Sequence, residues 1–140
     1  MNKIFFITVC VLIGNSAVAD ANDFRCLKSI SLKNPVRLQF TFPSDKDGVG
    51  YVTYQNGDGR IALRKAKEQE LRRAPGGRPS EFETRWEEVS PDGTGGTYIL
   101  VSQGALLTGF RYIRKKDRKI FRFEEDLDAS TENRCEWNTR

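Results

Sequence analysis

The sequence contains no histidine. Histidine is the commonest general base near neutral pH and the commonest metal ligand, so its absence removes the usual means of acid–base and metal-assisted catalysis. Carboxylates are the remaining catalytic candidates, and we expect no metal site and no cofactor. The composition therefore favours a protein that binds a partner over an enzyme.

Long apolar runs are also scarce. The run Ile4–Ile13 follows one charge, Lys3, and is too short for the roughly 20 residues of a transmembrane helix. It leads into Ala17-Val18-Ala19, the small-residue pattern at which signal peptidase cleaves. We predict that residues 1–19 are a signal peptide and that the mature chain is periplasmic or secreted and does not span a membrane. A lipid-attachment site at Cys10 is the alternative, but the residues before it are not small, which favours soluble export.

Two cysteines, Cys26 and Cys135, remain near the two ends of the mature chain. In an oxidising compartment such a pair most simply forms one disulfide, which leaves no thiolate nucleophile. Residues 20–140 have the length of one domain and contain no internal repeat. The formal net charge is +4, of which one unit is lost with Lys3, and this mild excess is not typical of a nucleic-acid-binding protein.

Alternation of apolar and polar residues is the dominant pattern after the signal. In Val36–Phe42 every second residue is apolar, which is typical of a half-buried strand, and Asn56-Gly57-Asp58-Gly59 favours a tight hairpin. The regular spacing predicts an all-β fold, a single small antiparallel barrel or sandwich of about eight strands, whose N- and C-terminal segments are joined by the disulfide. The predicted strands are Phe24–Ser31, Val36–Phe42, Gly50–Gln55, Arg60–Lys65, Glu81–Val89, Thr97–Gln103, Ala105–Arg114 and Lys119–Glu124.

The stretch Ala66–Arg73 is ambiguous between strand and helix. It holds good helix formers and a possible i,i+4 pair between Glu68 and Arg72. It ends at the turn-rich Ala74–Pro79. We favour an extended, solvent-facing hairpin arm over a short helix.

Acidic residues gather near the C-terminus, at Glu124, Glu125, Asp126 and Asp128. Such a group could supply the acid and base of a glycosidase or the ligands of a calcium site. It is also typical of a solvated strand end that balances basic residues nearby, and we favour that interpretation.

The most informative local feature is a basic hairpin over residues 110–123. Its central part, from Arg111 to Arg122, carries seven basic residues and one acid, interleaved with aromatic and aliphatic side chains. Clustered cations attract acidic ligands, but an edge hairpin is also commonly charged to prevent aggregation, and both interpretations stay open. The candidate binding residues are Tyr98, Arg111, Tyr112, Arg114, Lys115, Lys116, Arg118 and Lys119.

An export signal, the early cysteine in Phe24-Arg25-Cys26, the strand 36–42 and the late Cys135 together resemble the periplasmic inhibitors of C-type lysozyme. The resemblance implies a small eight-stranded barrel that blocks a wall hydrolase by inserting loop side chains into its active-site cleft. Those inhibitors carry a Ser-Gly-x-x-Tyr loop, for which this chain offers only Gly95-Gly96-Thr97-Tyr98. A basic inhibitor would also repel a basic lysozyme. Periplasmic immunity proteins, which neutralise injected toxins, are similar in size and compartment.

These observations lead to a main hypothesis and two alternatives. The main one is a non-enzymatic periplasmic protein that binds and neutralises another protein, an envelope-targeting hydrolase or toxin. The second is a module that binds an anionic envelope ligand, lipopolysaccharide or an acidic glycan, through the basic hairpin. The third, which we favour least, is hydrolysis by Glu124, Glu125 or Asp126.

Overall fold

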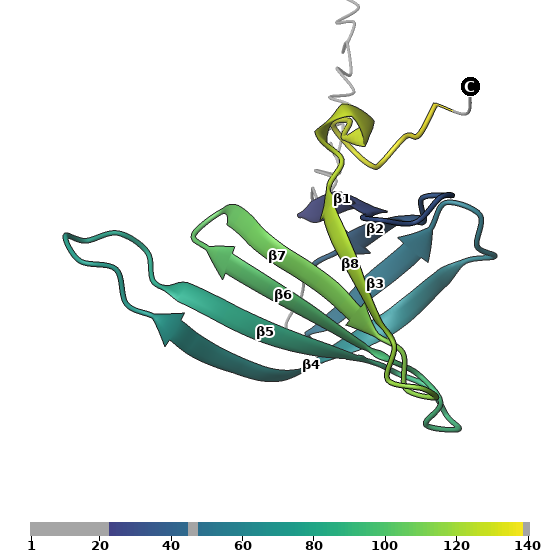
Figure 1. Cartoon of the computed structure of the whole chain (residues 1–140), viewed down its shortest axis with the longest axis horizontal. Helices are drawn as coiled ribbons and strands as arrows, with labels where there is room; N and C mark the ends of the chain where they lie inside the picture. The colour runs from purple at the N-terminus through teal and green to yellow at the C-terminus, as the bar shows by residue number, and fades with distance from the viewer. Residues whose placement is uncertain (1–22, 45–47, 139–140) are drawn as a thin grey trace, which may run out of the picture.

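The computed structural model describes residues 23–44 and 48–138. Over these residues the protein is a closed antiparallel barrel whose eight strands pair in chain order, with β1 closing the ring against β8 (Figure 1). The elements are β1 (Phe24–Ser29), β2 (Arg37–Thr41), β3 (Val49–Tyr54), β4 (Arg60–Arg72), β5 (Glu81–Glu88), β6 (Thr97–Gln103), β7 (Leu106–Ile113), β8 (Ile120–Glu125) and the 3-10 turn η1 (Leu127–Ala129). The predicted all-β fold is confirmed, and the pairing of β1 with β8 makes it a barrel. The predicted signal peptide, residues 1–19, lies outside the described residues.

Side chains from alternate positions of the strands fill the barrel interior. The buried cluster consists of Leu27, Leu38, Phe40, Val52, Leu63, Trp86, Tyr98, Leu100, Phe110 and Phe123. The Phe40 ring packs edge-on against Trp86 and Phe110, with ring centroids 5.5 and 5.8 Å apart, an arrangement that aromatic quadrupoles favour. Val36, which the alternation places on the buried face, precedes β2 and is exposed. The barrel interior is therefore a packed core.

The hairpin of β4 and β5 extends beyond the barrel wall as an arm (Figure 1). β4 is 13 residues long and stays paired with β5 as far as Arg72 and Glu81, with irregularities between Lys65 and Lys67 and between Glu70 and Arg72. The extended arm predicted for 66–73 is therefore confirmed over its length in β4. Most of its side chains are exposed, which agrees with their polar composition.

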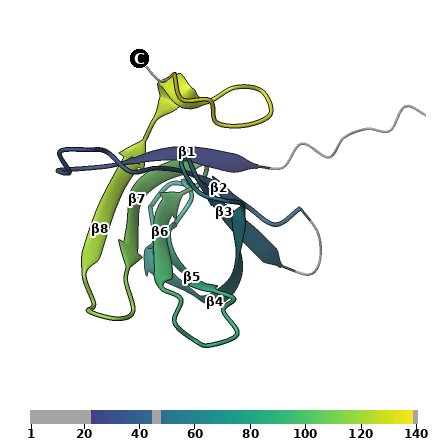
Figure 2. The same cartoon turned by 90° about the vertical axis from the view of Figure 1, so that its right-hand side faces the viewer.

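The C-terminal segment crosses the outside of β1 and β2 (Figure 2). The predicted disulfide between Cys26 and Cys135 is present, with Cα atoms 5.6 Å apart. Ala129, Phe24 and Trp137 pack around it. The N–H of Cys135 donates to Oε1 of Gln39 at 2.8 Å. This small second core therefore fastens the chain's end to the barrel wall.

The chain order brings four loops to one end of the barrel, because successive antiparallel strands reverse direction. These loops are residues 30–36, 55–59, 89–96 and 114–119, and we call this end the loop face. The arm, the turn 104–105, the end of β2 and the start of β3 lie at the other end. Among the described residues, no helix has the length and apolar character needed to cross a membrane.

Candidate functional site

The basic loop 114–119 is held in one conformation by Asp117. Its carboxylate accepts hydrogen bonds from Nε and Nη2 of Arg114 at 3.0 and 2.6 Å and from the N–H of Lys119 at 3.2 Å. The Arg114 guanidinium, as the main cause, lowers the pKa of Asp117 to about 2, and Asp117 in turn raises the pKa of Arg114. Arg118 adopts a left-handed conformation with φ of 59° at the turn. The guanidinium of Arg114 is therefore bonded within the loop. The side chains exposed to solvent are those of Lys115, Lys116, Arg118 and Lys119.

The neighbouring loop 89–96 is organised in the same way by Asp92. Its Oδ1 accepts hydrogen bonds from the hydroxyl of Ser90, from the N–H of Thr94 at 3.1 Å and from the hydroxyl of Thr94 at 2.7 Å. These bonds, led by the one from Ser90, lower the pKa of Asp92 to about 2. Gly93 has a φ of 66°, which glycine adopts at little cost. The loop is therefore a defined turn although it lies on the surface.

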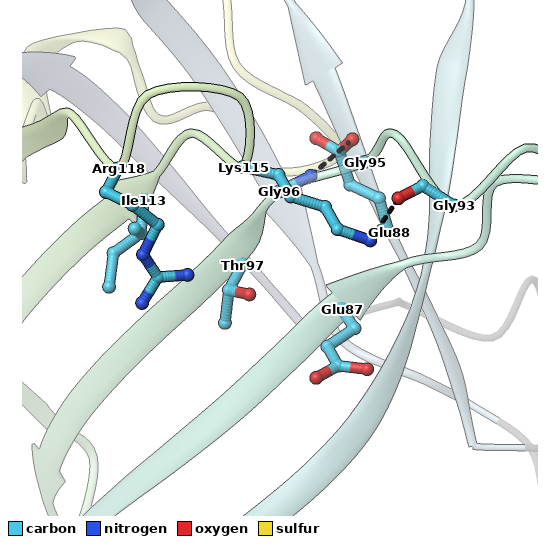
Figure 3. A pocket seen from close by; sticks show the side chains of 9 residues that line it. All are labelled: Glu87, Glu88, Gly93, Gly95, Gly96, Thr97, Ile113, Lys115 and Arg118. Atoms are coloured by element: carbon cyan, nitrogen blue, oxygen red, sulfur yellow. Dashed lines mark hydrogen bonds between the residues drawn. The ribbon is translucent and has the colours of Figure 1, made fainter.

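The two loops meet across a cleft of about 290 Å³ (Figure 3). Lys115 reaches over it and its Nζ donates to the carbonyl oxygen of Gly93. The lining consists of Glu87, Glu88, Gly93, Gly95, Gly96, Thr97, Ile113, Lys115 and Arg118. We call the pair of loops, 89–96 and 114–119, the two-loop edge. Its rim presents cations from one loop and backbone carbonyls from the other.

A chain of partly buried hydrogen bonds supports the two-loop edge from the barrel side. The hydroxyls of Tyr54 and Tyr98 lie 2.6 Å apart, and that of Tyr98 donates to Oε1 of Glu88 at 3.1 Å. Oε2 of Glu88 accepts a hydrogen bond from the N–H of Gly96 at 3.0 Å. This bond connects loop 89–96 to Glu88 and the two tyrosines. Burial raises the pKa of Tyr54 to about 12 and also raises the pKa of Tyr98. Both phenols therefore stay protonated near neutral pH.

Tyr112 packs against this hydrogen-bonded chain. Its ring centroid lies 4.7 Å from that of Tyr98, and burial raises the pKa of its hydroxyl. Gly96 allows the approach, since a Cβ atom at this position would lie 2.3 Å from the Tyr112 ring. The tyrosines thus pack behind Gly96 and Glu88, which line the cleft.

The structure divides the predicted binding residues into three groups. Lys115, Lys116, Arg118 and Lys119 stand together at the exposed tip, with Arg114 behind them bonded to Asp117. Tyr98 is completely buried, and Tyr112 is half-buried beside it. Arg111 lies on the outer wall, where its Nη2 donates to the buried carboxylate of Glu83 at 3.0 Å.

Three contributors to the site were not among the predicted residues: Asp92, Glu88 and Gly96. The run Pro91–Gly96 predicts a turn, but the partners of Asp92 within it are set by the folded loop. For Glu88 a signal exists, because the alternation that buries Trp86 in β5 also directs Glu88 inward. A carboxylate on an inward-facing position indicates a hydrogen-bonded role inside the barrel.

The C-terminal acids do not form a cluster aimed at a common point. Glu124, Glu125 and Asp126 each approach a different cation of β1 or β2, at 3.6, 3.4 and 3.9 Å. Those cations are Lys28, Arg25 and Arg37. Within residues 23–44 and 48–138, no three His, Cys, Asp or Glu side chains gather as a metal site would require.

Comparison of the chain with protein families, with characterised proteins and with solved structures finds no match.

Proposed function

We propose that this protein is a non-enzymatic binding protein that docks onto another protein, a cell-envelope hydrolase, and neutralises it through the two-loop edge. The observation that carries the proposal is the internal organisation of the edge. In each loop an aspartate, Asp117 or Asp92, accepts hydrogen bonds from residues of the same loop. The two loops are joined by the hydrogen bond from Lys115 to the carbonyl of Gly93. Loops that hold their conformation before binding lose little entropy on docking, which is the usual route to tight inhibition by exposed loops.

The charge of the edge favours a target with an acidic cleft. Loop 114–119 contains five basic residues and one acid, and four of the basic side chains are exposed. Hydrolases of wall glycans typically carry two carboxylates in the active-site cleft. A cationic loop complements such a cleft and accelerates the encounter, whereas a strongly basic enzyme would repel it. The expected target is therefore an acidic hydrolase or one with an acidic cleft.

The scaffold supports the same proposal. A closed barrel with a packed interior, fastened by the Cys26–Cys135 disulfide, holds the loops on a rigid base. Disulfides persist in oxidising compartments, which supports the proposed export to the periplasm or beyond. The resemblance to lysozyme inhibitors and immunity proteins supports the proposed class of partner.

The test is inhibition of purified wall hydrolases that range from acidic to basic proteins. Their activity is followed as loss of turbidity of a peptidoglycan suspension, with and without the protein. We expect inhibition of an acidic member and about tenfold slower association when Lys116→Glu reverses one tip charge at low salt. The matched control is Lys67→Glu, which reverses an exposed charge on the arm.

Two outcomes would contradict the proposal. One is an absence of inhibition across the panel, and the other is an equal effect of Lys116→Glu and Lys67→Glu. Binding of lipopolysaccharide or an acidic glycan to the tip, with no hydrolase bound, would instead establish the alternative of an anionic envelope ligand.

A further inference from the structure

A second surface of the loop face is apolar and exposed. Among the described residues eight large hydrophobic side chains are exposed, and three of them line one cleft at the start of β8. These are Ile30, Leu32 and Ile120, with 44%, 36% and 49% of their surface accessible, and we call them the apolar ledge.

A backbone hydrogen bond connects the two segments of the apolar ledge, which lie far apart in the sequence. The N–H of Ile30 donates to the carbonyl of Arg122 at 2.9 Å, which joins the first loop to β8. A cleft of about 230 Å³ lies between residues 29–32 and 119–122. Ile30, Leu32 and Ile120 thus line the two sides of one cleft.

Cations flank the apolar ledge. Lys119 and Arg122 line its cleft, and Lys33 follows Leu32 in the loop. All three are exposed, and within the described part of the chain none has a carboxylate within 4.0 Å. The nearest acid along β8, Glu124, pairs with Lys28 instead. The surface therefore combines exposed apolar groups with uncompensated positive charge.

We propose that the apolar ledge docks on an anionic phospholipid bilayer. At such a surface apolar side chains enter the boundary of the acyl region while lysine and arginine meet the phosphates. A second copy of the chain is a poorer occupant, because a symmetric contact would bring the same three cations together. The cleft of the ledge shares no lining residue with the cleft of the two-loop edge. Lys119 belongs to loop 114–119 as well as to the cleft of the ledge, whereas Arg122 and the three apolar side chains belong to the ledge alone. The membrane contact therefore goes beyond the proposed inhibition and can be tested separately from it.

The experiment is co-sedimentation of the purified protein with phosphatidylcholine vesicles that contain or lack phosphatidylglycerol. We expect binding to the anionic vesicles only, weakening as salt is added. Arg122→Gln should lower the partition coefficient about fivefold. Ile120→Ser should also lower it about fivefold, because roughly half of the side chain is available for burial. Leu32→Ser serves as a second apolar variant.

The matched control is Leu127→Ser, which removes a leucine that is 75% exposed at the other end of β8. Its partition should equal that of the unmodified protein. Equal binding to neutral and anionic vesicles, no binding to anionic vesicles at low salt, or equal losses for Ile120→Ser and Leu127→Ser would each overturn the proposal. So would self-association in sedimentation velocity that Ile120→Ser abolishes, since this would assign the ledge to a homodimer.

Discussion

Replacing Gly96 with alanine tests whether Tyr112 packs against the backbone of the two-loop edge as described. The added Cβ would lie 2.3, 2.4 and 2.5 Å from the Cε2, hydroxyl and Cζ atoms of Tyr112. Tyr112 has little room to retreat, because its ring packs on Tyr98 at 4.7 Å and on Phe121 at 6.2 Å between centroids. The substitution should therefore displace the ring or the loop rather than be absorbed.

Two opposing contributions set the expected magnitude. Forcing an extra methyl group into a packed site costs about 1–3 kcal/mol. Replacing glycine with alanine stabilises by about 0.4–1 kcal/mol through the unfolded chain, where the native backbone suits both residues. Gly96 is not in a left-handed conformation, so this gain applies. We expect Gly96→Ala to lower the free energy of unfolding by about 1–2 kcal/mol.

A double-mutant cycle measured by urea unfolding identifies the cause. Tyr112→Leu removes the three clashing atoms, so Gly96→Ala should be neutral or slightly stabilising in that background, whereas Tyr112→Phe keeps the ring and should keep the cost. The control is Gly109→Ala, since a Cβ there makes an ordinary contact with Val101 at 3.5 Å. Equal costs of Gly96→Ala in the native and Tyr112→Leu backgrounds would refute the reasoning.

Three further outcomes are expected. The lowered pKa values of Asp92 and Asp117, about 2 against an ordinary 3.8, stabilise the folded state above pH 4, and this contribution is lost as the pH falls from 4 to 2. Across that range the urea midpoint should decline less for Asp92→Asn and Asp117→Asn than for the unmodified protein. The same dependence of the midpoint on pH in all three proteins would contradict the loop geometry. Arg118→Gly should raise the free energy of unfolding by about 0.5–1 kcal/mol, because glycine tolerates the left-handed conformation at this turn. The same variant should weaken partner binding, since it removes a cation from the tip. A lower free energy of unfolding would argue against the left-handed turn. Replacing both Cys26 and Cys135 with serine should lower the free energy of unfolding by roughly 4–5 kcal/mol, since the bridge closes a 109-residue separation, and an unchanged urea midpoint would show that it contributes little.

The positions of the strands along the chain were predictable because alternation is a local property. In β2 and β5, apolar residues at every second position mark both the strand and its buried face, and the interior cluster contains Leu38, Phe40 and Trp86 accordingly. The residues at which strands begin and end were harder to predict. Val36 continues the alternation of β2 but lies in the preceding loop, because its N–H bonds to the Ser29 hydroxyl.

The candidate site was predictable only in part. The exposed cations at 115–119 follow from their position at a hairpin tip, which the alternation of the flanking strands indicates. Arg111 has the same charge and is only four residues from Lys115, but it pairs with Glu83 on a different strand. No local pattern reveals that partner, because it lies 28 residues earlier in the chain.

The sequence by itself determined the strands, the hairpin tips and the pairing of Cys26 with Cys135, because each depends on local alternation, turn chemistry or the small number of cysteines. Only the tertiary structure decided that the sheet closes into a barrel, since closure depends on the register between β1 and β8. It also decided which charges remain free. Glu88 is bonded to Tyr98 and Asp117 to Arg114, while Lys119 and Arg122 stay uncompensated beside an apolar surface. Burial and pairing arise between residues distant in sequence, and these two properties make the basic hairpin part of two candidate binding surfaces that share Lys119.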